Sequence, residues 1–491
     1  MKLNGRIYNL ECVNFAIIVI ILLRIECCYM KRVPKIAIVG GGIGGTSASF
    51  FLNELFGPRG AHIDLYEPNN IGGRLSVINV EGRDYEVGGS IIHKRNKYMV
   101  DFLKLFGLKK KDSRYSRFGL YDGRDFLFTE SNWEIINLAK LIWRYGYGPL
   151  ELDNYINNML NKFELIYTLQ ANHKSFATVL ELLTAMNPQF VNAMNTSAYS
   201  GFQEKGFSQR IIDELITATL TANYGQSTTV HEFVGSVSVA GAGGGLWAVH
   251  GGNKRIPQEL LKHSKATVLA ARVTGITLKP ETEDFVVDFV HTKDFSTRNS
   301  SVYDIVIVAT PLTEDTHADI YFKNFPSSLK FPGKYHRTVC TIVHGKLNFT
   351  YFGFENEKDT VDSILTVKLD LIFSAIGRLS PVDYQIDEGQ FDIWKIFSQV
   401  PLTEEQIHTL FLKHRSVHVV DWMAYPEYYV DQRHDNFILH NNLFHVNAIE
   451  WAASAMEMSV IGAKNVALLA HKSWAGVSTD TETTKTFKEE L

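Results

Sequence analysis

The chain contains very little cysteine, with only four cysteines among its 491 residues. Three of them, Cys12, Cys27 and Cys28, stand near the start of the sequence, and the fourth is Cys340. No two are spaced as C-x-x-C. This scarcity excludes a small domain held together by disulfides, and it excludes a C-x-x-C redox or zinc site. The fold must therefore be stabilised by an apolar core.

Other motifs of common enzyme classes are also missing. The sequence has no G-x-S-x-G turn and no H-E-x-x-H pair, so it carries neither the signature of a hydrolase nucleophile nor that of a zinc protease. We predict no metal site. The net charge is only −4, and the one basic cluster, Lys109–Lys111 with Arg114 and Arg117, is short. Such a cluster is typical of a solvated face, and no nucleic-acid partner is predicted.

Long apolar runs are nearly absent, and the one notable run lies from Phe15 to Leu23, after Lys2 and Arg6. It is too short to cross a bilayer core of about 30 Å as a helix. We interpret residues 1–28 as a secretory signal peptide cleaved near Cys28. Only Cys340 would then remain in the mature chain.

Three N-x-S/T sequons follow, and each predicts a glycan on an exposed loop. They are Asn195, Asn299 and Asn348. Together with the signal peptide they predict a lumenal destination, which we expect to be the lysosome, with secretion as the alternative.

What the chain does have is enough apolar sequence for more than one core. Hydrophobic residues make up 45% of it and charged residues 21%, as in folded globular proteins. Its length exceeds what one core usually supports. We expect two domains, or one large domain built from separated segments.

The most informative stretch is IAIVGGGIGG at residues 36–45, in which Gly40-x-Gly42-x-x-Gly45 follows an apolar strand, 35–39. Helical spacing of apolar residues follows at 46–55. The first glycine permits a tight turn, the second lets backbone approach a pyrophosphate, and the third lets the helix pack on the strand. The helix then points its N-terminal amides at the phosphates. The predicted pyrophosphate contacts are Gly40, Gly42, Ile43, Gly44 and Gly45.

A second strand, 62–66, ends in Glu67, 22 residues after Gly45. An acidic residue at this place accepts the ribose hydroxyls of an adenosine and disfavours a 2′-phosphate. FAD or NAD is therefore favoured over NADP. The alternative is a tight turn of an α/β sheet that holds no ligand.

The remainder of the chain separates into three patterns. Residues 101–233 are largely helical, with aromatic-rich runs at 133–143 and 150–169 that we interpret as core in preference to a wall for a greasy substrate. Residues 321–425 alternate as in antiparallel sheet. Nucleotide-type signals return at Gly251-Gly252, in a strand at 266–276 and in the strand that stops at Pro311. A long alanine-rich helix is predicted from Asn447 to Ala470, packed either on the sheet or close to a ligand.

Several of these stretches together resemble the flavin-dependent amine oxidase and phytoene desaturase superfamily. They are Lys35–Phe51, Glu67 with Gly72-Gly73-Arg74-Leu75, residues 86–90, Gly251-Gly252 and residues 303–312. The resemblance implies that the cofactor is FAD and that Arg74 is a charge partner for its pyrophosphate. The further cofactor contacts that it implies are Gly73, Val273, Thr310 and Glu450.

Within that superfamily the chain resembles the prenylcysteine oxidase family most. The more specific stretches are Tyr224–Ser227, Leu246–Lys254, Tyr351–Phe354 and Asn447–Ser454. The resemblance implies oxidation of S-farnesyl- or S-geranylgeranyl-cysteine with O2 and water, which gives free cysteine, a prenyl aldehyde and hydrogen peroxide. An amine or polyamine oxidase, or a noncatalytic lipid-binding flavoprotein, stays open as an alternative.

Three residues are candidates for a catalytic role, because the flavin supplies the hydride acceptor and the protein mainly positions the substrate. His93 could act as the base for water attack, as could His250. Lys254 could lie near the substrate carboxylate or the flavin. Each residue could instead have only a structural role. The histidines would then be structural residues with their hydrogen bonds formed, and the lysine would be a surface residue at the start of a helix.

The expected fold class is α/β, with a Rossmann-like FAD-binding domain split along the chain. We assign residues 35–100, 240–312 and 436–475 to it, and residues 101–239 and 313–435 to an α+β substrate domain with helices and antiparallel sheet. A prenyl chain partitions into bilayers, by about 0.8 kcal/mol per CH₂, so peripheral contact with a membrane or a lipoprotein is expected. The sequence shows no strongly amphipathic basic helix for it, and it leaves the oligomeric state open.

Overall fold

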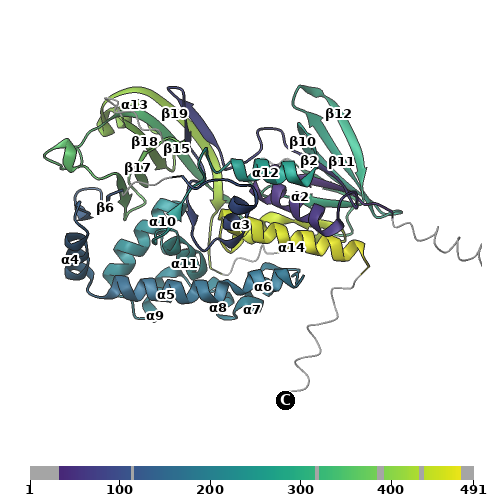
Figure 1. Cartoon of the computed structure of the whole chain (residues 1–491), viewed down its shortest axis with the longest axis horizontal. Coiled ribbons are helices and arrows are strands. Elements are labelled where there is room, and N and C mark those ends of the chain that lie inside the picture. Colours follow the sequence, from purple (N-terminus) through teal and green to yellow (C-terminus); the bar gives the residue numbers. More distant parts are fainter. Residues whose placement is uncertain (1–31, 112–115, 316–319, 384–391, 431–435, 477–491) are drawn as a thin grey trace, which may run out of the picture.

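The structure is a computed structural model that describes residues 32–111, 116–315, 320–383, 392–430 and 436–476. The predicted signal peptide, residues 1–28, lies outside these residues. Figure 1 shows a nucleotide-binding region at one end, formed around α2, α12 and α14, and a region of helices and long strands at the other. Among the described residues, no helix is both long enough and apolar enough to cross a membrane.

A six-stranded sheet forms the centre of the nucleotide-binding region. The strands β21, β13, β1, β2 and β9 run parallel in that order, and β20 pairs antiparallel with β21 at one edge. Continuous apolar runs form the inner strands, as expected for a sheet covered on both faces. The bounds are β1 Lys35–Val39, β2 His62–Tyr66, β9 Thr267–Leu269, β13 Ile305–Val308, β20 Ile438–His440 and β21 Leu443–His445.

The two faces of this sheet pack on different partners. Ile36 and Ile38 of β1 belong to the core shared with the helices α2 (Ile43–Phe56), α12 (Arg255–Ser264) and α14 (Met456–Trp474). Ala37 and Val39 belong to a separate core on the opposite face. This alternation follows from the two-residue period of a strand.

The second core is shared with a four-stranded sheet, β12-β11-β10-β14. A buried polar contact also joins the two sheets, since Tyr303 donates to Asp64 at 2.8 Å and its hydroxyl lies 2.6 Å from that of Tyr66. The bounds are β10 Ala271–Lys279, β11 Asp284–His291, β12 Asp294–Tyr303 and β14 Tyr321–Lys323.

The other region is built on a seven-stranded sheet with the order β19-β15-β18-β17-β16-β6-β7. All pairs are antiparallel except β16 with β6, which is parallel. The sheet is therefore mixed, and two of its strands come from the predicted helical stretch. The bounds are β6 Phe118–Tyr121, β7 Phe126–Thr129, β15 Tyr335–Leu347, β16 Ser363–Thr366, β17 Ala375–Leu379, β18 Asp392–Ser398 and β19 Phe411–Pro426.

Helices fill the space beside this sheet and beneath α14 (Figure 1). Their starts show ordinary capping chemistry: Thr178 and Glu181 form a reciprocal capping box at α7. The bounds are α3 Lys97–Leu105, α4 Glu134–Tyr145, α5 Gly148–Phe163, α6 Leu165–Ala171, α7 Val179–Met186, α8 Gln189–Met194, α9 Ala198–Glu204, η1 Ile211–Ile216, α10 Thr217–Tyr224, α11 Glu232–Ala240 and α13 Glu404–Leu410. The short elements are β3 Val77–Val80, β4 Arg83–Glu86, β5 Ile92–His93, β8 Leu246–Trp247 and η2 Glu357–Asp359.

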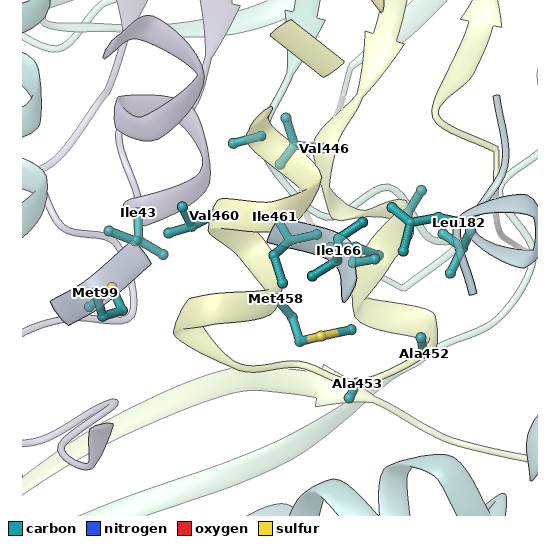
Figure 2. Close-up of a cluster of buried hydrophobic side chains, with 14 of the residues drawn as sticks. Ile43, Met99, Ile166, Leu182, Val446, Ala452, Ala453, Met458, Val460 and Ile461 are labelled. Carbon is teal, nitrogen blue, oxygen red and sulfur yellow. The ribbon is translucent and has the colours of Figure 1, made fainter. Parts of the chain in front are cut away.

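Helix α14 lies at the junction of the two regions. Figure 2 shows Met458, Val460 and Ile461 of this helix within one buried cluster. Their neighbours in the cluster come from α2, α3, α6 and α7, and the labelled ones are Ile43, Met99, Ile166 and Leu182. One helix thus packs on the nucleotide-binding elements and on the helical half at once.

The helix predicted from Asn447 to Ala470 was wrong at its start. Val446–Trp451 form a short 3₁₀-helix, η3, and α14 begins only at Met456, after an extended Ala455. Glu450 and Ser454, which lie before α14, form hydrogen bonds with Arg74 and Tyr428. These contacts hold the chain in a non-helical path that alanine content alone does not reveal.

The predicted domain segments are distributed as follows. The parallel sheet takes its strands from within residues 35–100, 240–312 and 436–475. The strand β14, which lies after residue 312, pairs with β10 of the second sheet. Parallel neighbours cannot be joined by tight turns and need longer crossover connections.

Candidate functional site

A cavity of about 1220 Å³ lies between the two regions. The nucleotide-binding side contributes the glycine turn after β1, the segment after β2 and the end of β13, while α5, α10, α11 and β19 line the other side. Pockets for one small ligand usually measure about 300–1000 Å³. This cavity therefore has room for a dinucleotide and a second molecule.

The glycine turn is held by contacts that leave no space for side chains. A Cβ on Gly45 would lie 1.9 Å from the Gly40 carbonyl oxygen, and one on Gly40 would lie 2.7 Å from that of Ala309. Gly40 also has φ +111°, which L side chains rarely adopt. Gly45 does not line the cavity, so it serves helix packing, whereas Gly40, Gly42, Ile43 and Gly44 line it.

A second glycine pair lies directly against this turn. Gly72 bridges to Gly42 in parallel register, and its N–H donates to the Gly41 carbonyl at 3.0 Å. A Cβ on Gly73 would lie 3.1 Å from the Gly42 Cα. Two backbone segments thus approach closely beside the N-terminus of α2, where the first-turn amides lack intrahelical acceptors. This is the geometry expected for binding a pyrophosphate.

Glu67 lies at the end of β2 and lines the cavity, with 8% of its surface exposed. Its two carboxylate oxygens accept from the N–H groups of Gly41 at 2.8 Å and Asn69 at 2.7 Å. These bonds orient the carboxylate. Each oxygen retains acceptor capacity, which suits it to the ribose hydroxyls that the sequence predicts as its partners.

Arg74 and Glu450, two predicted cofactor contacts far apart in the sequence, pair with each other. The Arg74 guanidinium donates through Nη2 to Glu450 Oε1 and through Nη1 to Oε2 at 3.0 Å. Tyr335 donates to the same carboxylate at 2.8 Å, and so does Asn447. Because its charge faces a buried carboxylate, Arg74 is less available to a phosphate than the sequence implied. We expect the amides of the glycine turn to carry that role.

The pKa directions agree with this pairing. Burial by itself would raise the pKa of Glu450, which is 1% exposed. The charge of Arg74 and the hydrogen bonds from Arg74, Tyr335 and Asn447 outweigh burial and hold that pKa below its usual value. The carboxylate is therefore ionised at neutral pH.

The two remaining predicted cofactor contacts, Thr310 and Val273, lie in different places. Thr310 follows β13 and lines the cavity next to the glycine turn. Val273 lies in the core between the two stacked sheets and does not line the cavity. Its side chain takes part in the packing between these two sheets.

The three catalytic candidates lie in different surroundings. His93 lines the cavity, and its Nδ1 accepts from the Arg95 N–H at 3.3 Å. Burial, followed by the charges of Lys94 and Arg95, lowers the pKa of His93, so its ring is neutral at neutral pH. Lys254 also lines the cavity and pairs with Asp84 at 3.3 Å. His250 does not line it, so the structure does not bring it together with the other two.

Sequence reasoning assigned no role to the aromatic wall of the cavity. Tyr224, at the end of α10, makes edge contacts with Tyr425 and Tyr428, with ring centroids 5.1 and 5.6 Å away. Tyr224 and Tyr425 line the cavity together with Trp422. Tyr224 lies in one of the family-specific stretches, and this was the available signal. Its partner Tyr425 on β19 lies some 200 positions further along the chain. Only the fold brings the two rings together.

Glu457 is a second residue that the sequence did not indicate. It lies in the first turn of α14, lines the cavity and accepts from the N–H groups of Tyr98 and Met99 and from the Tyr167 hydroxyl. Burial raises the pKa of Glu457 to about 7, against the lowering effect of these hydrogen bonds. It joins the starts of α3 and α14.

The residues present fit FAD. Two helix N-termini, those of α2 and α14, line a single elongated cavity, and each favours negative charge or a hydrogen-bond acceptor. The close-packed glycines lie beside the N-terminus of α2, and Glu67 lines the cavity at the end of β2. This arrangement would suit an extended dinucleotide with its pyrophosphate at the N-terminus of α2 and its flavin ring toward α14.

Comparisons with known proteins define the family. The model of the prenylcysteine lyase family matches residues 128–483, and that of an NAD(P)-binding Rossmann-like domain matches residues 38–106. Human prenylcysteine oxidase 1 is 40% identical over 90% of this chain and 90% of its own, and the bovine protein is 39% identical over 90% and 89%. The chain belongs to the prenylcysteine oxidase family. The predicted resemblance is confirmed, and these findings support FAD as the cofactor.

Solved structures agree with the fold. Putrescine oxidase superposes with a TM-score of 0.54 at 13% identity, over 88% of this chain and 98% of its own. Cyclohexylamine oxidase from Brevibacterium oxydans gives 0.55 at 13% identity, over 90% and 99%. The predicted α/β fold class is confirmed.

The three sequons lie in different local structures. Asn195 is exposed at the end of α8, and Asn348 lies in the turn after β15, where its side-chain amide donates to Thr409 at 3.0 Å. Asn299 lies inside β12 and pairs with Phe289, so the expectation of a loop was wrong there. The strand β12 is at the edge of its sheet. Glycans at the three positions stay a prediction.

Proposed function

We propose that this protein is an FAD-dependent thioether oxidase that cleaves S-prenyl-cysteine with O2 and water to free cysteine, a prenyl aldehyde and hydrogen peroxide. The observation that carries the proposal is family membership along 90% of the chain, together with a cavity that joins the glycine turn to an apolar wall. Such a reaction would serve the breakdown of prenylated proteins.

Bound FAD would supply the hydride acceptor that no protein side chain provides. The protein's own contribution is positioning. The amides at the start of α2 and the Glu67 carboxylate hold the nucleotide, while the close contact of Gly42 with Gly73 shapes its path. The Arg74–Glu450 pair fixes β19, since Arg74 also donates to the Ala424 carbonyl.

The opposite wall of the cavity suits a prenyl chain. Met159, Leu160 and Phe163 of α5 line it, with Val237 of α11 and Leu246 of β8 facing the same space. Burying one isoprenoid methylene group favours binding by about 0.8 kcal/mol. An apolar wall beside the reacting atoms also limits the access of water, so that water reaches the oxidised carbon only at a defined place.

Of the two histidine candidates, His93 is the one placed to receive a proton from that water. It is neutral at neutral pH and lines the cavity, whereas His250 does not. The proton-accepting role of His93 is part of the proposal. The comparison of a His93→Gln with a His250→Gln variant tests it, and equal loss of kcat in both would argue against it.

The decisive experiment measures hydrogen peroxide with farnesylcysteine, geranylgeranylcysteine and a polyamine as substrates. We expect the purified protein to carry flavin absorbance and to form peroxide with the prenyl thioethers. Turnover of amines alone would assign an amine oxidase. Bound flavin that farnesylcysteine does not reduce under anaerobic conditions would identify a noncatalytic lipid-binding flavoprotein.

We also propose that the protein reaches the lysosome through the secretory pathway, with secretion as the alternative. The apolar run before residue 28 and the three sequons support this proposal. Glycosidase treatment of protein from cell fractions and from the medium tests it. Protein without glycans in the cytosolic fraction would argue against it.

A further inference from the structure

The surface of α4 is unusually apolar. Of the large hydrophobic side chains that are exposed in the described part of the chain, eight lie within residues 133–150. Ile135 is 84% exposed and Trp143 87%. The other members of this apolar ridge are Trp133, Ile136, Leu138, Ile142, Tyr147 and Leu150. Apolar residues scattered singly are normal, whereas a contiguous group marks an interaction surface.

The ridge follows from the helical period of α4. Its inner side buries Asn137 and Tyr145, with Leu141 packed against the core clusters. Ile135, Leu138 and Ile142 recur at i, i+3 and i+7 and are all exposed, at positions where a helix on the surface normally places charges. The interpretation of residues 133–143 as ordinary core was therefore wrong for these exposed residues.

The charges near the ridge are turned to its flanks. Arg144 forms two hydrogen bonds with Glu214, both at 2.7 Å, and Lys140 donates to the Thr129 carbonyl at 2.9 Å. No charged residue stands among the outward positions 135, 138, 139, 142 and 143. The outer stripe is thus uncharged, with Lys140 and Arg144 beside it and the exposed Glu134 in the first turn of α4.

The placement of the aromatic residues points to lipid as the occupant. Trp133 lies at one end of α4, and Trp143 and Tyr147 lie at the other, with aliphatic side chains between them. Tryptophan and tyrosine prefer the boundary between headgroups and acyl chains. Figure 1 shows α4 at the outer edge of the molecule. A ridge enters a lipid surface more readily than it forms a flat protein interface.

We propose that α4 and the start of α5 form a docking surface that inserts shallowly into a phospholipid surface. An amphipathic helix with Trp, Ile and Leu on one face and cations at its flanks lies in the plane of the interface. The helix of 12 residues is about 18 Å long, which suits such a shallow element. Sequence reasoning found no such helix because it could not tell an exposed apolar face from a buried one.

Docking at this place would also serve the supply of substrate, a consequence that rests on the proposed function. The helix α5 begins at the ridge, at Gly148, and its other end contributes Met159, Leu160 and Phe163 to the cavity. A prenylated amino acid concentrates in bilayers. One helix therefore connects the lipid-facing surface with the wall of the binding cavity.

Binding to vesicles tests the docking directly. The full-length mature protein is incubated with phosphatidylcholine vesicles, with and without phosphatidylserine, and separated by flotation. The double variant Ile135→Ser/Trp143→Ser removes the two most exposed apolar side chains of α4. We expect its partition coefficient to fall about tenfold or more, since a factor of ten corresponds to about 1.4 kcal/mol. Because the stripe is uncharged, wild-type binding should need no anionic lipid and should change little with salt.

A matched control changes two exposed apolar residues elsewhere, as Val400→Ser/Leu412→Ser, which are 60% and 47% exposed. This control should bind vesicles like the wild type. Equal binding by the α4 variant, or equal loss in the control, would overturn the proposal. A dimer in light scattering that the α4 variant dissociates, without vesicle binding by the wild type, would assign the ridge to a second copy of the chain.

The peroxide assay separates this inference from the proposed function. With farnesylcysteine in detergent, the α4 variant should keep the wild-type rate, whereas with geranylgeranylcysteine in vesicles its rate should fall about as far as its binding. Vesicle binding that depends on α4 in a protein without peroxide production would leave the docking surface standing and refute only the enzymatic proposal.

Discussion

The two sides of the cavity are lined by different kinds of groups. On the nucleotide side the lining is mostly backbone of glycines, such as Gly40, where an added side chain would clash, together with the Glu67 carboxylate. On the other side the lining comes from side chains, such as those of Leu160 and Tyr224. The nucleotide side should therefore tolerate almost no substitution, whereas the side chains that line the other side can vary in shape. We therefore expect binding of the cofactor to be more sensitive to substitution than binding of the substrate.

The largest effect should come from filling the glycine turn. A Gly45→Val variant would place its Cβ 1.9 Å from the Gly40 carbonyl oxygen, so α2 must move away from β1. We expect loss of bound flavin and destabilisation by about 4 kcal/mol or more. Flavin absorbance per mole of protein and urea unfolding measure both effects. A Gly244→Ala control, with no atoms within 4 Å of the added Cβ, should leave them unchanged.

The next largest effect should come from breaking the ion pair that links the two sides. Arg74→Met leaves the Glu450 carboxylate buried without its charge partner, at a cost of about 3–5 kcal/mol. Urea unfolding should show this loss. Removing the carboxylate as well, in Arg74→Met/Glu450→Gln, should restore part of the stability. Additive losses in the double variant would show that the pair is not coupled.

A third test concerns the carboxyl group of Glu457, which joins α3 and α14. Burial raises its pKa from 4.5 to about 7 in the folded protein, so the folded state binds this proton more tightly than the unfolded state. The contribution of this group to stability is full below about pH 4.5 and is lost as the pH rises to about 7. The expected decrease is about 2–3 kcal/mol.

Glu457→Gln should flatten this part of the pH dependence, since an amide does not titrate. Chemical unfolding at several pH values between 4 and 8 provides the measurement, with the wild type as reference. A variant curve that is parallel to that of the wild type would contradict the assignment.

The smallest effect should follow a change in the apolar wall. Leu160→Asn shortens and polarises one lining side chain of α5. We expect KM for farnesylcysteine to rise about tenfold, equivalent to about 1.4 kcal/mol, while flavin content stays at the wild-type level. Steady-state kinetics of peroxide formation provide the measurement. Loss of flavin in this variant would contradict the separation of the two sides.

The sequence predicted the parts of the fold whose signals are local. The strands 35–39 and 62–66 were predicted with the bounds that the structure shows, because each is a short segment rich in apolar residues next to the predicted turn or to Glu67. The predicted helix at 447–470 began too early, since long-range contacts of Glu450 and Ser454 override its alanine content. The aromatic wall was missed because Tyr224 and Tyr425 meet only in the folded chain.

The sequence by itself determined the cofactor turn, because a glycine needed for space or for positive φ is visible as a residue type. It also determined the family, since the matching stretches are spread over most of the chain. Only the tertiary structure decided that Arg74 faces Glu450, that His93 lines the cavity while His250 does not, and that the apolar side of α4 faces outward. Each of these depends on which distant segments pack together, and helical or strand periodicity reports which residues share a face without reporting what covers it.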